Sequence, residues 1–406
     1  MTNLPSANCL SKTAFTLALL SALTLLASQP MPAQTFTTLH DFTGGNDGGA
    51  PAGVLTMDRA GNLYGVTTNG GGDNHCSPGP SCGVVFKLTH RGTSWLYSSI
   101  YAFHGRDGAN PQAGVVFGPD GALYGTAGGG ATGLGIVFRL QPPASICKAV
   151  SCLWTETVLH SFTGGTQDGA GTGYGPPAFD RAGNMYGTTP GGGAANVGTV
   201  YEISPSNGAW VEKVLYSFQN VPDGSQPYAG LAFDNAGNLY GTTVSGGFDR
   251  GGTVFELSPN GSGWTESVLY RFPSDGQDAS PFAGATLDAS GNVYFASGSG
   301  RITVYELSPS GSGWTSQALY QLQALWGPYE SMNFDSTGSL LGTVYQGTPR
   351  VFRLTPSNGQ WTLTGFDGND GGGSLSNATP DANGNVYGTF SVGGAYGHGS
   401  VFQVTP

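Results

Sequence analysis

The sequence has little charge, and most of that charge is negative. Only 10% of its 406 residues are charged, and 14 Lys and Arg stand against 25 Asp and Glu, a formal net charge of -11 at pH 7. No stretch forms a basic stripe. Because such a surface repels phosphate backbones and anionic lipid headgroups, we exclude nucleic acid as a partner.

Long apolar runs are also missing. The longest, Ala14–Ala27, spans 14 residues, whereas a transmembrane helix needs about 20. Lys12 precedes this run and small residues follow it as far as Ala33, a pattern typical of a secretory signal peptide cleaved before Gln34. We expect residues 1–33 to be a signal peptide and residues 34–406 to be a secreted or periplasmic protein without a membrane span. An uncleaved anchor is the alternative.

Cysteine is scarce, with five in the chain. Cys9 lies in the expected signal peptide. The other four form two close pairs, Cys76 with Cys82 and Cys147 with Cys152. Their short separation and their place in loops favour two local disulfides formed in an oxidising compartment. A zinc site that uses His75 beside Cys76 is the alternative, but it needs a second pair of ligands nearby.

What the chain does have is glycine, 70 residues in all, and a repeated phrase close to Asp-x-x-Gly-Asn-Leu-Tyr-Gly. The phrase occurs seven times at intervals of 46 to 62 residues. Its first glycines are Gly61, Gly121, Gly183, Gly237, Gly291, Gly338 and Gly384. A period of this length is typical of propeller blades and solenoid units.

The repeat from Tyr228 to Phe272 shows what each unit contains. β-Branched and aromatic residues predict strands at 229–234, 238–243, 253–258 and 264–272, and Gly, Asn, Asp and Ser predict the turns between them. Four short antiparallel strands make one propeller blade. The mature region lacks the 3.6-residue apolar period of a helix, so a helical solenoid is disfavoured.

The two ends of the chain are predicted to complete one blade together. Six tryptophans open the fourth strand of their repeats, but the seventh repeat ends at Pro406 before its own fourth strand. Thr35–Phe42 resembles the fourth strand at Thr157–Phe162 and has no first three strands ahead of it. We therefore predict an all-β fold, a seven-bladed β-propeller of four-stranded antiparallel blades. Thr35–Phe42 pairs with Ser400–Val404 to close it, and we expect one monomeric domain.

The residues that recur in every blade are interpreted as structural. An aspartate three positions before the repeat glycine is expected to accept hydrogen bonds from backbone N–H groups of its turn. These are Asp58, Asp180, Asp234, Asp288, Asp335 and Asp381. The tyrosine of the phrase is expected to pack between adjacent sheets. His40 and His160 replace a tyrosine of other repeats, which marks them as aromatic packing positions and not as general bases.

The spaced phrases together resemble the GloVer tandem-repeat family of bacterial exported proteins. The likeness covers almost the whole mature chain and is clearest over Val214–Trp264. It implies a secreted or surface-displayed repeat protein of uncharacterised biochemical role. Members of that family often end in a sorting or anchoring segment. This chain ends at Pro406 inside the seventh blade, which favours a free secreted or periplasmic protein over an anchored one.

One recurring feature could support binding. Six aspartates stand in the loops that enter the first strands, and the predicted strand order brings them to one face, around the mouth of the central channel. They are Asp47, Asp107, Asp168, Asp223, Asp278 and Asp370. Turn chemistry alone explains an Asp-Gly pair. The alternative is a ring that binds cations, with calcium as the candidate, or that accepts hydrogen bonds from a sugar.

The sequence therefore supports two classes of function. The first is a non-catalytic binding or structural scaffold at or outside the cell envelope, with a glycan, a protein or an envelope component as its partner. The second is a propeller enzyme, a hydrolase or lyase, that acts on polysaccharide. No Ser/His/Asp triad, isolated carboxylate pair or histidine-rich metal set is recognisable, so we assign no catalytic residues and no metal ligands.

Overall fold

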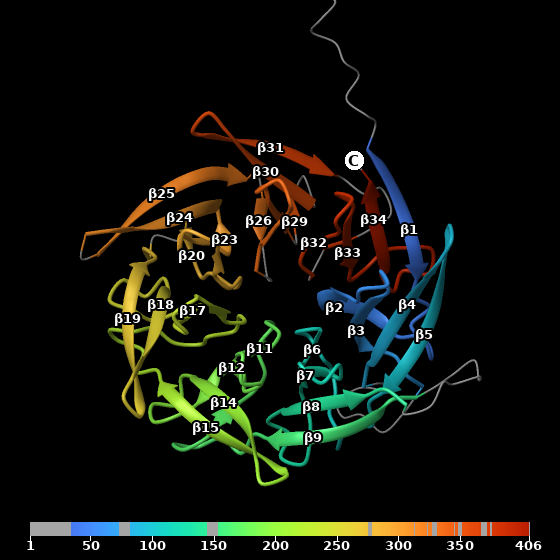
Figure 1. Cartoon of the computed structure of the whole chain (residues 1–406), viewed down its shortest axis with the longest axis horizontal. Coiled ribbons are helices and arrows are strands. Elements are labelled where there is room, and N and C mark those ends of the chain that lie inside the picture. The colour runs from blue at the N-terminus through green and yellow to red at the C-terminus, as the bar shows by residue number, and fades with distance from the viewer. Residues whose placement is uncertain are drawn as a thin grey trace, which may run out of the picture.

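The computed structural model describes residues 34–72, 82–143, 153–274, 278–311, 313–322, 324–326, 331–344, 346–347, 351–366, 372–373 and 376–405. Strands, turns and loops account for all of these residues, and none of them forms a helix long and apolar enough to cross a membrane. Seven sheets, each of four antiparallel strands, surround one axis (Figure 1). The predicted seven-bladed β-propeller is confirmed.

Each blade places its four strands in order from the axis to the rim. The innermost strands are β2 (Gly49–Met57), β6 (Val115–Phe117), β11 (Ala178–Phe179), β16 (Ala232–Phe233), β21 (Thr286–Leu287), β27 (Asn333–Phe334) and β32 (Thr379–Pro380). The second strands are β3 (Leu63–Asn69), β7 (Leu123–Ala127), β12 (Met185–Thr189), β17 (Leu239–Thr243), β22 (Val293–Ala296), β28 (Leu340–Thr343) and β33 (Val386–Phe390). The third strands are β4 (Val84–Arg91), β8 (Ile136–Gln141), β14 (Thr199–Ser206), β18 (Thr253–Asn260), β24 (Ile302–Ser310), β30 (Val351–Ser357) and β34 (Ser400–Thr405). The outer strands are β5 (Ser94–Ala102), β9 (Thr155–Ser161), β15 (Ala209–Ser217), β19 (Gly263–Arg271), β25 (Gly313–Leu322), β31 (Gln360–Phe366) and β1 (Thr35–Asp41).

The innermost strand of most blades is shorter than predicted. In the fourth blade the sequence predicts a strand over 229–234, but β16 covers only Ala232–Phe233. The backbones of neighbouring blades nearly touch at the axis: a Cβ placed on Gly175 would lie 1.6 Å from the backbone nitrogen of Gly230. Glycine permits this approach, and the chain there contacts the next blade instead of continuing the ladder of its own.

The ring is closed by both ends of the chain. β1 pairs antiparallel with β34, from Thr35 opposite Thr405 to Asp41 opposite Ser400. Nearer the axis, the Thr379 hydroxyl of the seventh blade donates to the Leu55 carbonyl of the first blade at 2.8 Å. These contacts confirm the predicted closure, which leaves neither β34 nor β1 as an isolated edge (Figure 1).

The hydrophobic core lies between the blades, in clusters that follow one another around the ring. At each of six interfaces, the tyrosine of the second strand packs its ring against the next blade. Tyr186, for example, lies 5.1 Å from Phe233 and 6.3 Å from Trp264, ring centroid to ring centroid, both in T-shaped geometry. This confirms the packing role that the sequence predicts for these tyrosines, and it explains why a tryptophan opens the outer strand.

The aspartate of the repeated phrase holds the turn between the first two strands. Oδ1 of Asp234 accepts hydrogen bonds from the backbone N–H groups of Ala236 and Asn238, at 2.8 and 2.9 Å. Oδ2 accepts from the Asn238 amide at 2.8 Å and from the Tyr240 hydroxyl at 3.3 Å. The same four contacts recur at Asp58, Asp180, Asp288 and Asp381. The predicted turn function is therefore confirmed.

Replacing Asp234 with alanine should lower the free energy of unfolding by about 1–3 kcal/mol, because the Asn238 amide and two backbone N–H groups lose their acceptor. Urea denaturation measures this loss. The exposed Asp249 in a loop of the same blade provides the control, and its change to alanine should stay within about 0.5 kcal/mol. Equal losses at the two positions would contradict a specific role for the turn carboxylate.

Candidate functional site

One face of the ring is built from two sets of loops, those that enter the innermost strands and those that join the second and third strands; we call it the loop face. Short strands pair the two sets. They are β10 (Gly169–Ala170), β13 (Gly191–Gly192), β20 (Asp278–Ala279), β23 (Ser299–Gly300), β26 (Ala324–Trp326) and β29 (Gln346–Gly347). Backbone bonds also cross from blade to blade, as from the Gln226 N–H to the Val197 carbonyl at 2.7 Å. The loop face is therefore tied together within and between blades.

Four of the predicted site carboxylates cap the turns that enter the innermost strands. Each accepts a hydrogen bond from the backbone N–H of a residue that follows the buried phenylalanine at the end of an outer strand. The pairs are Thr43 with Asp47 at 3.0 Å, His104 with Asp107 at 2.7 Å, Thr163 with Asp168 at 2.7 Å and Gln219 with Asp223 at 3.1 Å. These contacts are those of turn capping.

The same carboxylates also contact a side chain on the outer strand of the preceding blade. His40 Nε2 lies 3.3 Å from Asp47, and His160 Nε2 lies 3.2 Å from Asp168. The hydroxyls of two tyrosines donate to the other two aspartates: Tyr101 to Asp107 at 2.5 Å and Tyr216 to Asp223 at 2.7 Å. These carboxylates thus face the outer strands. His40 and His160 pack against Phe42 and Phe162 as the sequence predicts, but each also has an aspartate as its partner.

Asp278 differs from these four. It stands three residues before Pro281, whereas Asp223 stands four before Pro227. Its Oδ1 accepts a hydrogen bond from the Thr303 hydroxyl of its own blade at 2.8 Å. Asp370 lies outside the described residues, and the proposed cation or sugar ring therefore remains a prediction.

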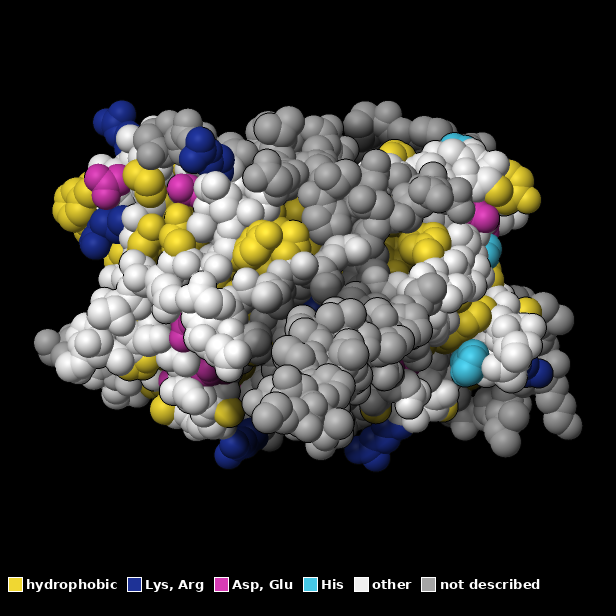
Figure 2. Space-filling model, turned by 90° about the horizontal axis from the view of Figure 1, so that it is seen from above, with side chains coloured by type: hydrophobic (Ala, Val, Ile, Leu, Met, Phe, Trp, Pro, Cys, Tyr) yellow, Lys and Arg dark blue, Asp and Glu magenta, His cyan; other side chains and the backbone are white. Residues whose placement is uncertain are grey.

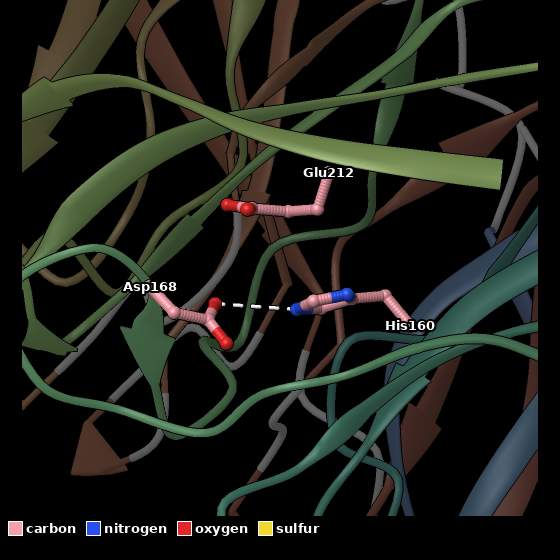
Figure 3. Close-up of side chains that lie close together, drawn as sticks. All are labelled: His160, Asp168 and Glu212. Atoms are coloured by element: carbon pink, nitrogen blue, oxygen red, sulfur yellow. Dashed lines mark hydrogen bonds and ion pairs between the residues drawn. The ribbon is translucent and has the colours of Figure 1, made fainter. Parts of the chain in front are cut away.

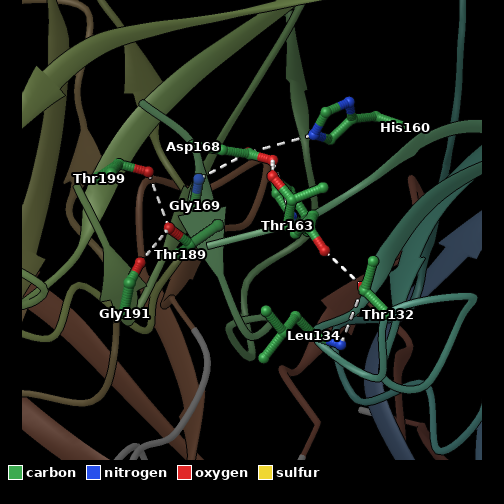
Figure 4. A network of polar contacts seen from close by, with 10 residues as sticks. Thr132, Leu134, His160, Thr163, Asp168, Gly169, Thr189, Gly191 and Thr199 are labelled. Carbon is green, nitrogen blue, oxygen red and sulfur yellow. Dashed lines mark hydrogen bonds and ion pairs between the residues drawn. The ribbon is translucent and has the colours of Figure 1, made fainter. Parts of the chain in front are cut away.

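The third blade brings three ionisable side chains together at its border with the second. His160 comes from β9, Asp168 from the entering loop and Glu212 from β15 (Figure 3). One ligand atom from each lies within 4.8 Å of the others. Asp168 is held from both sides, since Oδ2 accepts from the Thr163 hydroxyl at 2.7 Å and Oδ1 from the Gly169 N–H at 2.6 Å (Figure 4). Burial alone would raise the pKa of Asp168, but the hydrogen bonds from Thr163 and from His160 lower it below its ordinary value.

Glu212 has counterparts at the two neighbouring interfaces. Glu156 and Glu266 occupy the same place on their outer strands, two residues after the tryptophan, and they face Asp107 and Asp223. In each of the three glutamates, Oε1 is buried and has no hydrogen-bond partner among the described residues. Burial, and then the nearby aspartate, raise the pKa of each to about 7. Sequence reasoning missed this set, although the repeated Trp-x-Glu was its signal.

These glutamates should make the protein less stable as the pH rises from about 4.5 to about 7. Their pKa is higher in the folded state than the ordinary 4.5, so the folded state binds more protons in this window and the free energy of unfolding falls. Melting curves across this range, with an E156Q/E212Q/E266Q variant beside the unchanged protein, measure the effect. The variant should show a flatter profile; identical profiles would contradict the assignment.

The loop face also carries exposed apolar side chains. Phe248, Val392 and Tyr396 lie in loops between second and third strands, and they are 66%, 48% and 62% exposed. Val221 in an entering loop and Leu134 in another second-to-third loop add to them. Arg271 lies over the Phe248 ring, with its guanidinium carbon 5.5 Å from the centroid. On the edge of the ring seen in Figure 2, hydrophobic side chains are exposed among uncharged ones, and charged side chains form small groups.

Near the axis, the innermost strands line a cavity of about 340 Å³. Leu231, Ala285, Met332, Asn333 and Asn377 are among the residues around it. No ionisable side chain is among the described residues of this lining. The cavity therefore offers shape, apolar surface and amide groups to a ligand, but no acid or base from this part of the chain.

Of the four cysteines in the predicted disulfides, only Cys82 falls within the described residues, where it is fully buried. Cys76, Cys147 and Cys152 lie outside them, as do residues 1–33. The two disulfides and the signal peptide therefore remain predictions.

Fold and repeat together define the class of protein: a β-propeller built from seven copies of one sequence repeat. The chain belongs to the Gloeobacter/Verrucomicrobia repeat family, whose sequence model matches residues 26–155 and 152–347. The resemblance drawn from the spaced phrases is thereby confirmed. No curated protein matches the chain.

Solved structures share the architecture at low sequence identity. One is a putative 6-phosphogluconolactonase from Bacteroides fragilis, with 14% identity, a TM-score of 0.50 and coverage of 80% of this chain and 85% of that one. Another is a protein from Lactobacillus plantarum, with 13% identity, a TM-score of 0.50 and coverage of 78% and 85%. At this identity the likeness concerns the fold alone.

Proposed function

We propose that this protein is an exported, non-catalytic scaffold whose loop face binds a component of the cell envelope. The observation that carries the proposal is that large exposed apolar side chains project from loops of one face, with two of them aromatic. Exposed aromatic and aliphatic groups on a polar surface are typical of binding sites. The blade-to-blade hydrogen bonds beneath them would limit the conformational entropy lost on binding.

The aspartates of the loops support binding over catalysis. Asp47, Asp107, Asp168 and Asp223 are each bonded to the backbone of their own turn, which makes them parts of the scaffold. An acid or base for hydrolysis or elimination would have to reach a bound polysaccharide. The rings of Phe248 and Tyr396, by contrast, are exposed to solvent on this face, where a partner can contact them.

The test compares two double variants of the mature protein, residues 34–406. F248A/Y396A removes the two aromatic rings of the loop face. L96A/V211A removes apolar side chains of similar exposure, 52% and 50%, from the outer strands of the rim. Binding to a glycan array and to purified envelope fractions is measured with each, in calcium and then in chelator.

The loop-face variant should lose at least about tenfold in affinity, whereas the rim variant should bind like the unchanged protein. Equal loss in both variants, or no binding by the unchanged protein, would contradict the proposal. Release of reducing or unsaturated sugar from a polysaccharide, abolished by changing a single loop carboxylate, would establish an enzyme instead.

A further inference from the structure

Three potential metal ligands converge at the border between the second and third blades. His160 and Asp168 lie eight residues apart on the connection between the two blades, and Glu212 comes from β15, far from both in sequence. His160 supplies an imidazole nitrogen, and Asp168 and Glu212 each supply a carboxylate oxygen (Figure 3). The site remains accessible, because the side chains of His160 and Asp168 are 22% and 11% exposed. A set of one nitrogen and two oxygens suits zinc and its first-row neighbours.

The adjacent interfaces show how this one departs from the repeat. Between the first and second blades the corresponding residues are Tyr101, Asp107 and Glu156; between the third and fourth they are Tyr216, Asp223 and Glu266. There a tyrosine hydroxyl, which donates to the aspartate, takes the place of the imidazole.

The border of the seventh and first blades has the histidine but lacks the glutamate. His40 lies beside Asp47, and Tyr97 occupies the glutamate position, where its ring stacks on the imidazole at 4.3 Å. Between the first and second blades, the His104 imidazole of the entering loop also lies beside an aspartate, with Nδ1 2.9 Å from Asp107 Oδ2. Among the described residues, the interface between the second and third blades is nevertheless the one where a histidine nitrogen and an oxygen of each carboxylate all lie within 4.8 Å of one another.

The electrostatics of this cluster favour a bound cation. Two carboxylates face each other, and Oε1 of Glu212 is buried without a hydrogen-bond partner among the described residues. A buried carboxylate oxygen with no partner is costly, and a metal ion between the two carboxylates would satisfy it and cancel their repulsion. Thr163 and Gly169 already hold the Asp168 carboxylate in place, as partners of metal ligands commonly do.

We propose that His160, Asp168 and Glu212 bind one divalent transition-metal ion, with Zn²⁺ as the ion of best fit. Ligand atoms around tetrahedral zinc lie about 3.4 Å apart, given bonds of about 2.0–2.2 Å. In the structure the three ligand atoms lie within 4.8 Å of one another, so they must approach by about 1 Å to bind one ion. Rotation about the side-chain bonds of Glu212 can supply this movement. The three protein ligands leave a fourth position for water, and the ion links the outer strands of two blades. This proposal is independent of the proposed function.

The matched variant is His160→Tyr, which gives this interface the residue present at the two neighbouring ones. The mature protein, freed of metal with chelator, is titrated with Zn²⁺ by calorimetry. We expect one ion per chain in the unchanged protein. His160→Tyr should weaken binding by more than about tenfold, since even changes to the partners of metal ligands cost about 10–100-fold. Its metal-free melting temperature should stay close to that of the unchanged protein.

A reciprocal variant tests whether these three donors are sufficient. Tyr101→His places an imidazole beside Asp107 and Glu156, so the stoichiometry should rise from one ion to two. Co²⁺ in place of Zn²⁺ provides a second readout, because its visible absorption reports nitrogen and oxygen ligation and should double in this variant.

Three results would overturn the proposal. If His160→Tyr binds Zn²⁺ as tightly as the unchanged protein, the ion lies elsewhere in the chain. If Tyr101→His still binds one ion, the three donors do not make a site. If the unchanged protein binds no Zn²⁺, the cluster is a hydrogen-bonded acid pair with a histidine beside it.

Discussion

A protein that begins at Thr43, and therefore lacks β1, should melt at least about 10 °C below one that begins at Gln34. Phe42 is fully buried, and its ring packs against Phe86 of the first blade with centroids 5.3 Å apart. Phe36 packs on Phe390 and Phe402 of the seventh blade. Losing the buried Phe42 alone costs about 3–5 kcal/mol, and the packing of Phe36 and the pairing with β34 are lost as well, so the total is roughly 8 kcal/mol. The unfolding entropy of about 2.1 cal/mol/K per residue amounts to about 0.8 kcal/mol/K for a domain this large, and the melting temperature therefore falls by about 10 °C.

Calorimetry or circular dichroism measures this shift. A terminal segment normally tolerates removal, so a large effect would be specific to the closing strand. As a further check, a synthetic peptide of residues 34–42 added to the shortened protein should restore part of the loss, because it can pair with the exposed edge of β34. An unchanged melting temperature after the deletion would contradict the role of β1 in closing the ring.

Replacing Gly252 with alanine should lower the free energy of unfolding by about 2–5 kcal/mol. Gly252 immediately precedes β18, the third strand of the fourth blade, and its φ of 96° is one at which side chains are strained. An added Cβ would lie 2.1 Å from the Thr243 carbonyl oxygen and 3.1 Å from Cδ of Pro281 in the next blade. The added methyl group would therefore press on the backbone of its own blade and on the entering loop of the next blade at the same time.

Gly313 is the matched control, because a Cβ added there meets nothing within 4 Å and its φ is ordinary. Its change to alanine should alter stability by less than about 0.5 kcal/mol. Urea denaturation of both variants decides the question. If the two variants have similar free energies of unfolding, the backbone of the loop face can shift to accommodate the extra methyl group, and its hydrogen bonds do not hold it rigid.

The repeat made most of the fold predictable. Seven copies of one phrase give the number of blades, and Thr35–Phe42 reads as an outer strand because it resembles Thr157–Phe162. The turn between the first two strands of a blade was also predictable, because an aspartate followed three residues later by a glycine marks it. The second repeat shows the limit. It has Gly118 in the aspartate position, and Asp120 accepts the Tyr124 hydroxyl at 3.0 Å instead.

The His160 cluster was harder to predict because its members come from different repeats. Within its own strand, Glu212 looks like any polar residue that alternates with apolar ones. Asp168 belongs to the loop that enters the third blade, whereas His160 belongs to the outer strand of the second blade. The turn between them brings His160 to Asp168, but only the packing of one blade on the next brings Glu212 to this pair, and a reading of each repeat in isolation cannot supply that contact.

The pairing of β1 with β34 places the first of the described strands beside the last of them. The hydrogen bond from Thr379 to Leu55 spans 324 residues of sequence, so neither contact can form before nearly the whole chain is available. The blades can fold one after another along the chain. The pairing of β1 with β34 joins residues far apart in sequence, and contacts of this kind slow folding. Until then, the chain carries two unpaired strand edges that invite association with other chains. Thr35–Asp41 therefore lacks its pairing partner from the moment it is synthesised until residues 400–405 are available.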